Sequence, residues 1–139
     1  MLRRTAALMA VAMVTACGGA DDSTPGTTGG SAAGNGALPM VELPEGVTQD
    51  MVAAGQQVFN QQTCFTCHGR NATGSPLAPA LNDGEWLNTD GSFDEIVRVI
   101  REGVAQPVQF PAPMPAMGGA PLSEDQIRQV AAYVYAVSR

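Results

Sequence analysis

Residues 64 to 68 read Cys64-Phe65-Thr66-Cys67-His68, and the rest of the chain is best understood outward from this stretch. Two thiols separated by two residues can bond the two vinyl groups of one porphyrin, and the histidine after the second thiol then lies beneath the iron. The spacing predicts one covalent haem c, with thioether bonds from Cys64 and Cys67 and with His68 as the proximal ligand. Because the sequence has a single histidine, a second histidine ligand from the same chain is excluded.

A proline-rich stretch from residue 110 to 119 supplies candidates for the sixth iron ligand. Met114 and Met117 both lie in it, and a thioether is a soft, neutral donor that suits an electron carrier. Met114 is preferred because prolines on both sides restrict its backbone, so that holding its sulfur at the iron costs little entropy. Met117 precedes two glycines and lacks that restraint. With seven methionines in the chain, either one could instead fill the core.

The N-terminus has the layout of an export signal. Arg3 and Arg4 precede an apolar run over residues 6–14, which is too short to cross a bilayer as a helix. Residues 14–17 read Val-Thr-Ala-Cys and resemble a bacterial lipobox, which implies cleavage before Cys17 and lipidation of its sulfur. The alternative is an ordinary cleaved signal with an unpaired cysteine.

Both interpretations place the mature chain outside the cytoplasm, and the lipobox places it on the periplasmic side of a membrane. General secretion is favoured over the twin-arginine route, because haem c is attached after export of the unfolded chain.

Composition divides the chain into three segments: a signal peptide over residues 1–16, a linker over 17–42 and a domain over 43–139. Between residues 18 and 39 there is almost no large apolar side chain, so this part cannot bury enough surface to offset the entropy of ordering. This composition predicts a flexible tether between a lipid anchor and the domain. The remaining length is sufficient for one small domain.

The chain is acidic, with a formal net charge of −6 at pH 7 and no lysine. Loss of the signal removes Arg3 and Arg4 and leaves five arginines against 13 acidic residues. This charge argues against nucleic acid and anionic lipid as binding partners. An electrostatically steered redox partner should therefore be basic, or docking should rest on an apolar patch.

Three amphipathic patterns predict an all-α domain, and no confident strand is expected. The first helix begins after Thr48 as N-cap and runs into Cys64. The second opens with a capping box at residues 92–95, Ser-Phe-Asp-Glu, and stops at Gly103. The third opens with another capping box that begins at Ser123.

A domain of this size buries only a modest share of its surface. The haem is expected to supply the missing apolar body, so that Phe59, Ile100 and Val134 serve both as core and as haem pocket. We expect the haem-free protein to be poorly folded.

From about Val52 to Arg139 the chain resembles the class I c-type cytochromes, single-haem proteins with a helical fold. The resemblance is carried by motifs in the family's order: Gly55 with Phe59, residues 64–69 (CFTCHG), 79–81 (PAL), 114–116 (MPA), 122–127 (LSEDQI) and 130–134 (VAAYV). It implies a fold wrapped around one haem, iron ligation by His68 and Met114, and one-electron transfer. It also implies that the Pro79 carbonyl accepts a hydrogen bond from His68.

The resemblance further implies that Gly55 lets the first helix cross the last one closely, near Tyr133. The family commonly has an aromatic residue where this chain has Met117.

Four further side chains have two interpretations each. Trp86 either donates its indole N–H to a haem propionate or anchors the core. Arg98 and Arg101 could pair with propionates, although solvated surface is favoured because the other face of their helix is apolar. Arg70, just after the motif, is undecided.

Other functions fit the same residues less well. A thioredoxin-like redox pair needs a strand-to-helix context and leaves His68 unexplained, and a zinc site needs more thiol or imidazole ligands. The serious alternative is a peroxidase-like haem enzyme or a gas-binding protein with an open sixth iron position. The sequence predicts instead a lipid-anchored monohaem electron carrier that is not an enzyme. Its donor and acceptor are redox proteins, and no small-molecule substrate binds the iron.

Overall fold

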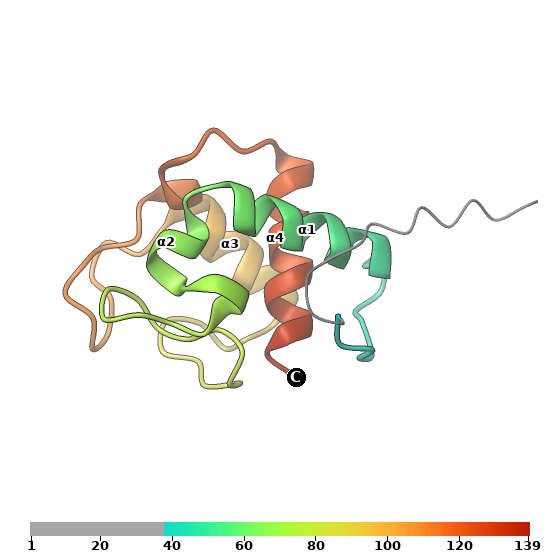
Figure 1. The fold of residues 1–139 in the computed structure, drawn as a ribbon, viewed down its shortest axis with the longest axis horizontal. Coiled ribbons are helices and arrows are strands. Elements are labelled where there is room, and N and C mark those ends of the chain that lie inside the picture. Colours follow the sequence, from blue (N-terminus) through green and yellow to red (C-terminus); the bar gives the residue numbers. More distant parts are fainter. Residues whose placement is uncertain (1–37) are drawn as a thin grey trace, which may run out of the picture. The chain divides into compact units, whose positions relative to one another are not determined.

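A computed structural model describes residues 38–139, and Figure 1 shows their fold. The helices are α1 (Gln49–Gln61), α2 (Cys64–His68), α3 (Phe93–Glu102) and α4 (Glu124–Val137), with short 3-10 helices η1 (Arg70–Ala72) and η2 (Ala116–Gly119). These described residues form no strand, and their one β-type pairing is an isolated antiparallel bridge between Val104 and Met114. The predicted all-α class is confirmed. The predicted signal peptide, Cys17 and most of the predicted linker lie outside the described residues.

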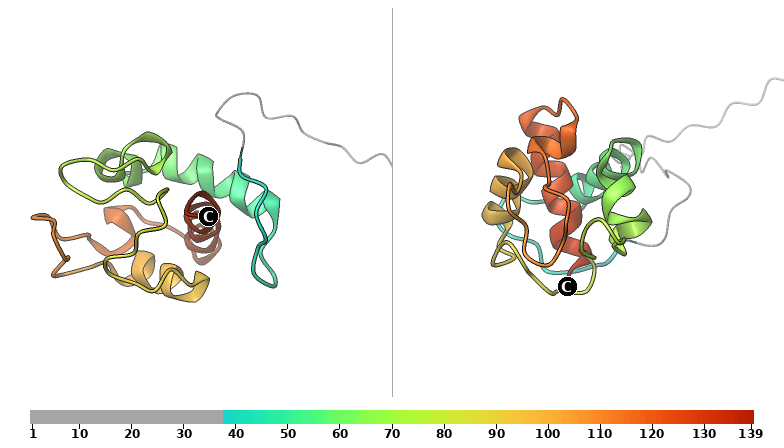
Figure 2. Two further views of the ribbon diagram at one scale, coloured as in Figure 1. Left: turned by 90° about the horizontal axis from the view of Figure 1, so that it is seen from below. Right: turned by 90° about the vertical axis from the view of Figure 1, so that its left-hand side faces the viewer.

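The crossing of α1 and α4 forms the centre of this unit (Figures 1 and 2). At Gly55 a Cβ atom would overlap the backbone carbonyl of Gln129 and lie 3.0 Å from the Cβ of Tyr133, so no larger residue fits. Next to this contact the rings of Phe59 and Tyr133 pack with centroids 5.3 Å apart, and both residues are 1% exposed. The glycine therefore permits the close crossing that the aromatic pair then fills.

Two of the three predicted helix starts are formed as expected. Thr48 caps α1, where its hydroxyl accepts a hydrogen bond from the Met51 N–H at 3.3 Å. Ser123 and Gln126 form a complete capping box at the start of α4, with bonds of 3.2 and 2.9 Å. These bonds satisfy N–H groups that the first turn of a helix leaves without a partner.

The predicted capping box of α3 is wrong. Ser92 is the N-cap, but its side chain makes no capping bond, and its own N–H donates to the Asp90 carboxylate at 2.8 Å. Asp90 thus takes the place of Glu95 as acceptor for the Ser92 N–H, and Glu95 is held instead by Arg98 at 2.8 Å.

The prediction that the first helix runs into Cys64 is also wrong. α1 ends at Gln61, Gln62 is extended, and α2 begins separately at Cys64. This break turns the cysteine motif away from the axis of α1.

Core packing extends to both ends of the described chain. Leu38, Val41 and Leu43 pack against the core, so residues before the predicted domain start at 43 contribute to it. α3 lays its apolar face on α4 through Phe93, Ile96, Val97 and Ile100. Within residues 38–139, no helix has the length and apolarity that crossing a membrane would require.

Candidate haem-binding site

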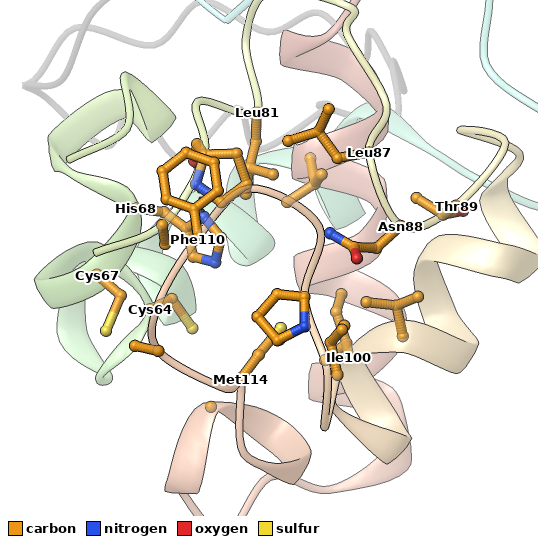
Figure 3. Close-up of a pocket in the computed structure, with 18 of the residues that line it drawn as sticks. Cys64, Cys67, His68, Leu81, Leu87, Asn88, Thr89, Ile100, Phe110 and Met114 are labelled. Atoms are coloured by element: carbon orange, nitrogen blue, oxygen red, sulfur yellow. Dashed lines mark hydrogen bonds between the residues drawn. The ribbon is translucent and has the colours of Figure 1, made fainter. Parts of the chain in front are cut away.

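An apolar pocket opens between α2, α3, α4 and the two long loops that join them (Figure 3). Its volume is about 1120 Å³ when the part open to solvent is included. The wall is formed by apolar residues such as Leu81, Ile100 and Val134. The predicted attachment, ligand and supporting residues all line this one pocket: Cys64, Cys67, His68, Pro79, Trp86 and Met114. Phe59 was expected to line it as well but does not, because its ring is buried against Tyr133 at the crossing of α1 and α4.

His68, at the end of α2, is held by a backbone carbonyl. Its Nδ1 lies 2.9 Å from the Pro79 oxygen, and since a carbonyl can only accept, Nδ1 carries the hydrogen. Burial lowers the pKa of His68, and the bond to Pro79 partly opposes this effect. The side chain is therefore a neutral imidazole whose Nε2 lone pair is free to bind a metal, which is the form required of a ligand.

A tight loop returns the chain from His68 to Pro79. The Gly74 N–H donates to the His68 carbonyl at 2.7 Å, and the Leu81 N–H donates to the Ala72 carbonyl at 2.8 Å. Ser75 donates its hydroxyl to the Cys67 carbonyl and accepts from the Leu77 N–H at 3.0 Å. Ser75 was not predicted as a site residue, although Ser75-Pro76 is a turn-initiating pair. Ser75 ties the loop that carries Pro79 directly to the cysteine motif.

The two cysteines of the motif are free thiols on the pocket wall. Burial raises the pKa of Cys64, and the negative charge of a Cys67 thiolate would raise it further. This is the reverse of the lowered pKa that makes a thioredoxin-type cysteine reactive. Among the described residues, the histidine, cysteine and carboxylate side chains form no group of three that could hold an ion.

Met114 reaches the same pocket from the opposite loop (Figure 3). Its backbone pairs with Val104, just after α3, through two hydrogen bonds of 2.8 and 3.0 Å. A Cβ atom at Gly103 would overlap the Met114 carbonyl oxygen and lie 2.8 Å from the Ala116 nitrogen. The end of α3 therefore clamps the Met114 backbone, and only glycine fits at position 103.

Met117 lies differently from Met114. It packs against the hydrophobic core and does not line the pocket. Its backbone is left-handed, with φ 55°, and Gly118 follows with φ 64°. Of the two methionines that the sequence offered, Met114 faces the haem pocket.

Trp86 has the core role that was one of its two predicted alternatives, and donation of its indole N–H to a propionate stays a prediction. It lines the pocket and also packs against the core. Its indole lies against Gly91, where a Cβ atom would overlap Nε1, so glycine is required at this contact.

The three arginines whose roles the sequence left open lie on the surface. Arg98 pairs with Glu95 and Glu102 at 2.8 and 3.1 Å, and its side chain is 44% exposed. Arg101 pairs with Glu124 at 2.5 Å, between α3 and α4. Neither lines the pocket. Arg70 lies over the Phe65 ring, 5.1 Å from its centroid.

These residues fit a haem c. Two thiols, a neutral imidazole with a free nitrogen and a thioether surround one apolar space, which is the donor set that holds this group. When bound, the haem supplies an iron that alternates between two oxidation states. The chain's own residues attach it, orient it and exclude water from it.

The chain matches a known family over most of the described unit. Residues 50–134 match the family described as cytochrome c oxidase, cbb3-type, subunit III. The chain therefore is a c-type cytochrome that carries covalent haem c. It belongs to the cbb3-type subunit III family.

Curated relatives and one solved structure agree with this assignment. The cbb3-type cytochrome c oxidase subunit FixPc of Rhizobium leguminosarum is 37% identical over 90 residues, which are 63% of this chain and 30% of the relative. Subunit CcoP of Rhodobacter capsulatus is 39% identical over 89 residues, which are 60% of this chain and 28% of the relative. This chain thus spans less than a third of those relatives. Cytochrome cL of Methylophaga aminisulfidivorans matches with a TM-score of 0.50 and 24% identity over 62% of this chain and 52% of its own, which shows the fold.

Proposed function

We propose that this protein is a one-electron carrier whose haem iron is ligated by His68 and Met114. The observation that carries the proposal is the presence of these two side chains on facing walls of one apolar pocket. With an imidazole and a thioether bound, the iron has no free position for a substrate, so it exchanges electrons without catalysis.

The surrounding residues tune that role. The Pro79 carbonyl fixes the tautomer and the orientation of His68. Two neutral ligands in an apolar pocket favour the less charged, reduced iron and so raise the reduction potential. Trp86 lines the pocket, and we propose that its indole N–H donates to a propionate.

One spectroscopic experiment tests the carrier against the enzyme. Ferric holo-protein is expected to be low-spin with the weak near-infrared band of iron–thioether ligation, and ferrous protein is expected to bind carbon monoxide poorly. Acid–acetone extraction should leave the haem on the protein. A ferrous form that binds carbon monoxide readily, with no such ferric band, would instead support a peroxidase-like or gas-binding function.

For the partner we propose a redox protein that docks on an apolar surface at the pocket mouth. Residues 71–82 and 103–123, which border the pocket, contain no ionisable side chain. Within them Leu77 and Val108 are 48% and 50% exposed. Electron exchange should therefore depend little on ionic strength, and Leu77→Glu should slow it. A steep salt dependence in the native protein would favour a basic partner steered by the acidic surface.

For the location we propose that Cys17 is lipidated after export and tethers the domain to the periplasmic side of a membrane. The support is the lipobox-like sequence before Cys17. Cys17→Ser should move the protein from the detergent phase to the aqueous phase without changing its haem spectrum. A native protein found unlipidated in the aqueous phase would contradict the anchor.

A further inference from the structure

We infer that Thr63 is a positioning residue that locks the loop of Met114, an inference that rests on the proposed ligation of iron by Met114. Its hydroxyl donates to the Gly118 carbonyl at 2.5 Å, across 55 positions of sequence. Thr63 immediately precedes Cys64, so this one bond joins the histidine side of the pocket to the methionine side. Both Thr63 and Gly118 line the pocket.

The hydroxyl of Thr63 does not make the capping bond that a threonine at this position ordinarily makes. Thr63 is the N-cap of α2, and an N-cap threonine commonly accepts a hydrogen bond from the first turn of its own helix. Here its side chain makes no capping bond, and its backbone is helical, with φ −74° and ψ −12°. The hydroxyl is instead directed to a distant loop.

The loop that it holds is strained. Met117 and Gly118 have consecutive left-handed conformations, with φ 55° and 64°. A methionine rarely adopts this conformation, and such strain persists only where surrounding contacts maintain it. The turn is closed by bonds from the Gly118 N–H to Pro115 at 3.0 Å and from the Ala120 N–H to Met117 at 3.2 Å. Met114 precedes this turn directly.

The turn also lies against the first haem-attaching cysteine. A Cβ atom at Gly118 would be 3.2 Å from the Thr63 hydroxyl oxygen and 3.8 Å from the Cys64 sulfur. The turn cannot swing outward without breaking the bond to Thr63. An outward movement of the whole Met114 loop together with this turn therefore requires the bond to break.

The test measures how easily an external ligand replaces Met114 in holo-protein. Imidazole binds ferric iron only when the methionine is displaced, so its apparent affinity reports the populated fraction of the open loop. Thr63→Val keeps the side-chain shape and removes the hydroxyl. Because Thr63 is exposed, this change leaves no core cavity. We expect imidazole affinity to rise by roughly three- to tenfold, which corresponds to the loss of one hydrogen bond.

Three comparisons make the test specific. Thr63→Ser retains the hydroxyl and should restore the native affinity. Thr73→Val removes another threonine-to-carbonyl bond, to Arg70 at 3.1 Å, and should leave imidazole affinity unchanged because it does not touch the methionine loop. Hydrogen exchange at the Ala120 N–H should accelerate in Thr63→Val alone.

The outcomes separate this inference from the proposed function. If native protein shows the near-infrared band and Thr63→Val binds imidazole with native affinity, the lock is wrong and Met114 ligation stands. A failure of Thr63→Ser to restore the affinity would likewise overturn the lock. If the native protein lacks the band, both the ligation and the lock are overturned.

Discussion

The two sides of the haem pocket hold their proposed iron ligands in different ways. On the histidine side, the bonds that fix His68 and Pro79 all run between residues 67 and 81, in a helix and the loop directly after it. On the methionine side, Met114 lies in a loop held by Val104 and, through Gly118, by Thr63. Local bonds close short loops at little entropic cost, whereas distant ones form only once the fold is assembled. We therefore expect the methionine side to open first.

The crossing of α1 and α4 is the frame that carries both sides of the pocket, and Gly55→Ala disrupts it. In an isolated helix alanine is favoured over glycine, so any loss of stability must come from packing. The new Cβ overlaps the Gln129 backbone, which cannot move without separating α1 from α4. We expect a loss on the order of 4 kcal/mol in the free energy of unfolding, or no holo-protein at all. Denaturant titration measures it.

Gly46→Ala is the control for this variant. At Gly46 a Cβ atom would meet nothing within 4 Å, although φ is +77°. Only the conformational cost remains, about 1 kcal/mol. Equal losses in the two variants would show that the helix crossing is not the limiting contact.

Met114→Ala removes the methionine side chemically and leaves the histidine side intact. We expect the near-infrared band to vanish, ferrous protein to bind carbon monoxide, and the potential to fall, because the soft sulfur donor is gone. Met117→Ala should keep the band and lower stability, since Met117 packs against the core. If the band survives in Met114→Ala and disappears in Met117→Ala, the assignment of the ligand is reversed.

The sequence predicted some features of the fold and of the site, and these were mostly the local ones. The cysteine motif, the cap of α1 and the capping box of α4 are signals carried by neighbouring residues or by helical periodicity, whereas the close approach at Gly55 was implied by the resemblance to class I c-type cytochromes. They predicted the all-α fold and the residues that gather around the pocket.

The sequence could not predict contacts between loop residues that carry no motif. The bridge from Val104 to Met114 and the bond from Thr63 to Gly118 depend on how loops meet after folding. The failed capping box at Ser92 has a different, local cause: Asp90 accepts the Ser92 N–H, and Arg98 holds the side chain of Glu95. Local signals show which bonds are available, and the assembled structure decides between them.

Gly103→Ala weakens the methionine side without removing its sulfur. The added Cβ overlaps the Met114 carbonyl and strains a backbone with φ +77°. We expect haem to remain attached, because the histidine side is untouched, and the near-infrared band to weaken or become temperature-dependent as Met114 dissociates part of the time. Absorption spectra between 5 and 45 °C, roughly the range over which a small domain stays folded, would measure this effect. An unchanged band would show that the clamp at Val104 does not position the ligand.

Ser75→Ala should have the smallest effect, and it tests the histidine side by itself. The change removes a bond to the Cys67 carbonyl and leaves the Leu77 N–H without its acceptor. We expect the free energy of unfolding to fall by about 1 kcal/mol, because the site is only partly buried and water can replace one partner. His68 remains held by α2 and Pro79, so imidazole affinity should stay at the native value, in contrast to Thr63→Val. Urea titration and imidazole binding on the same preparation measure both quantities. If Ser75→Ala instead raises imidazole affinity as much as Thr63→Val does, the loop after His68 also controls displacement of the methionine, and the two sides act as one unit.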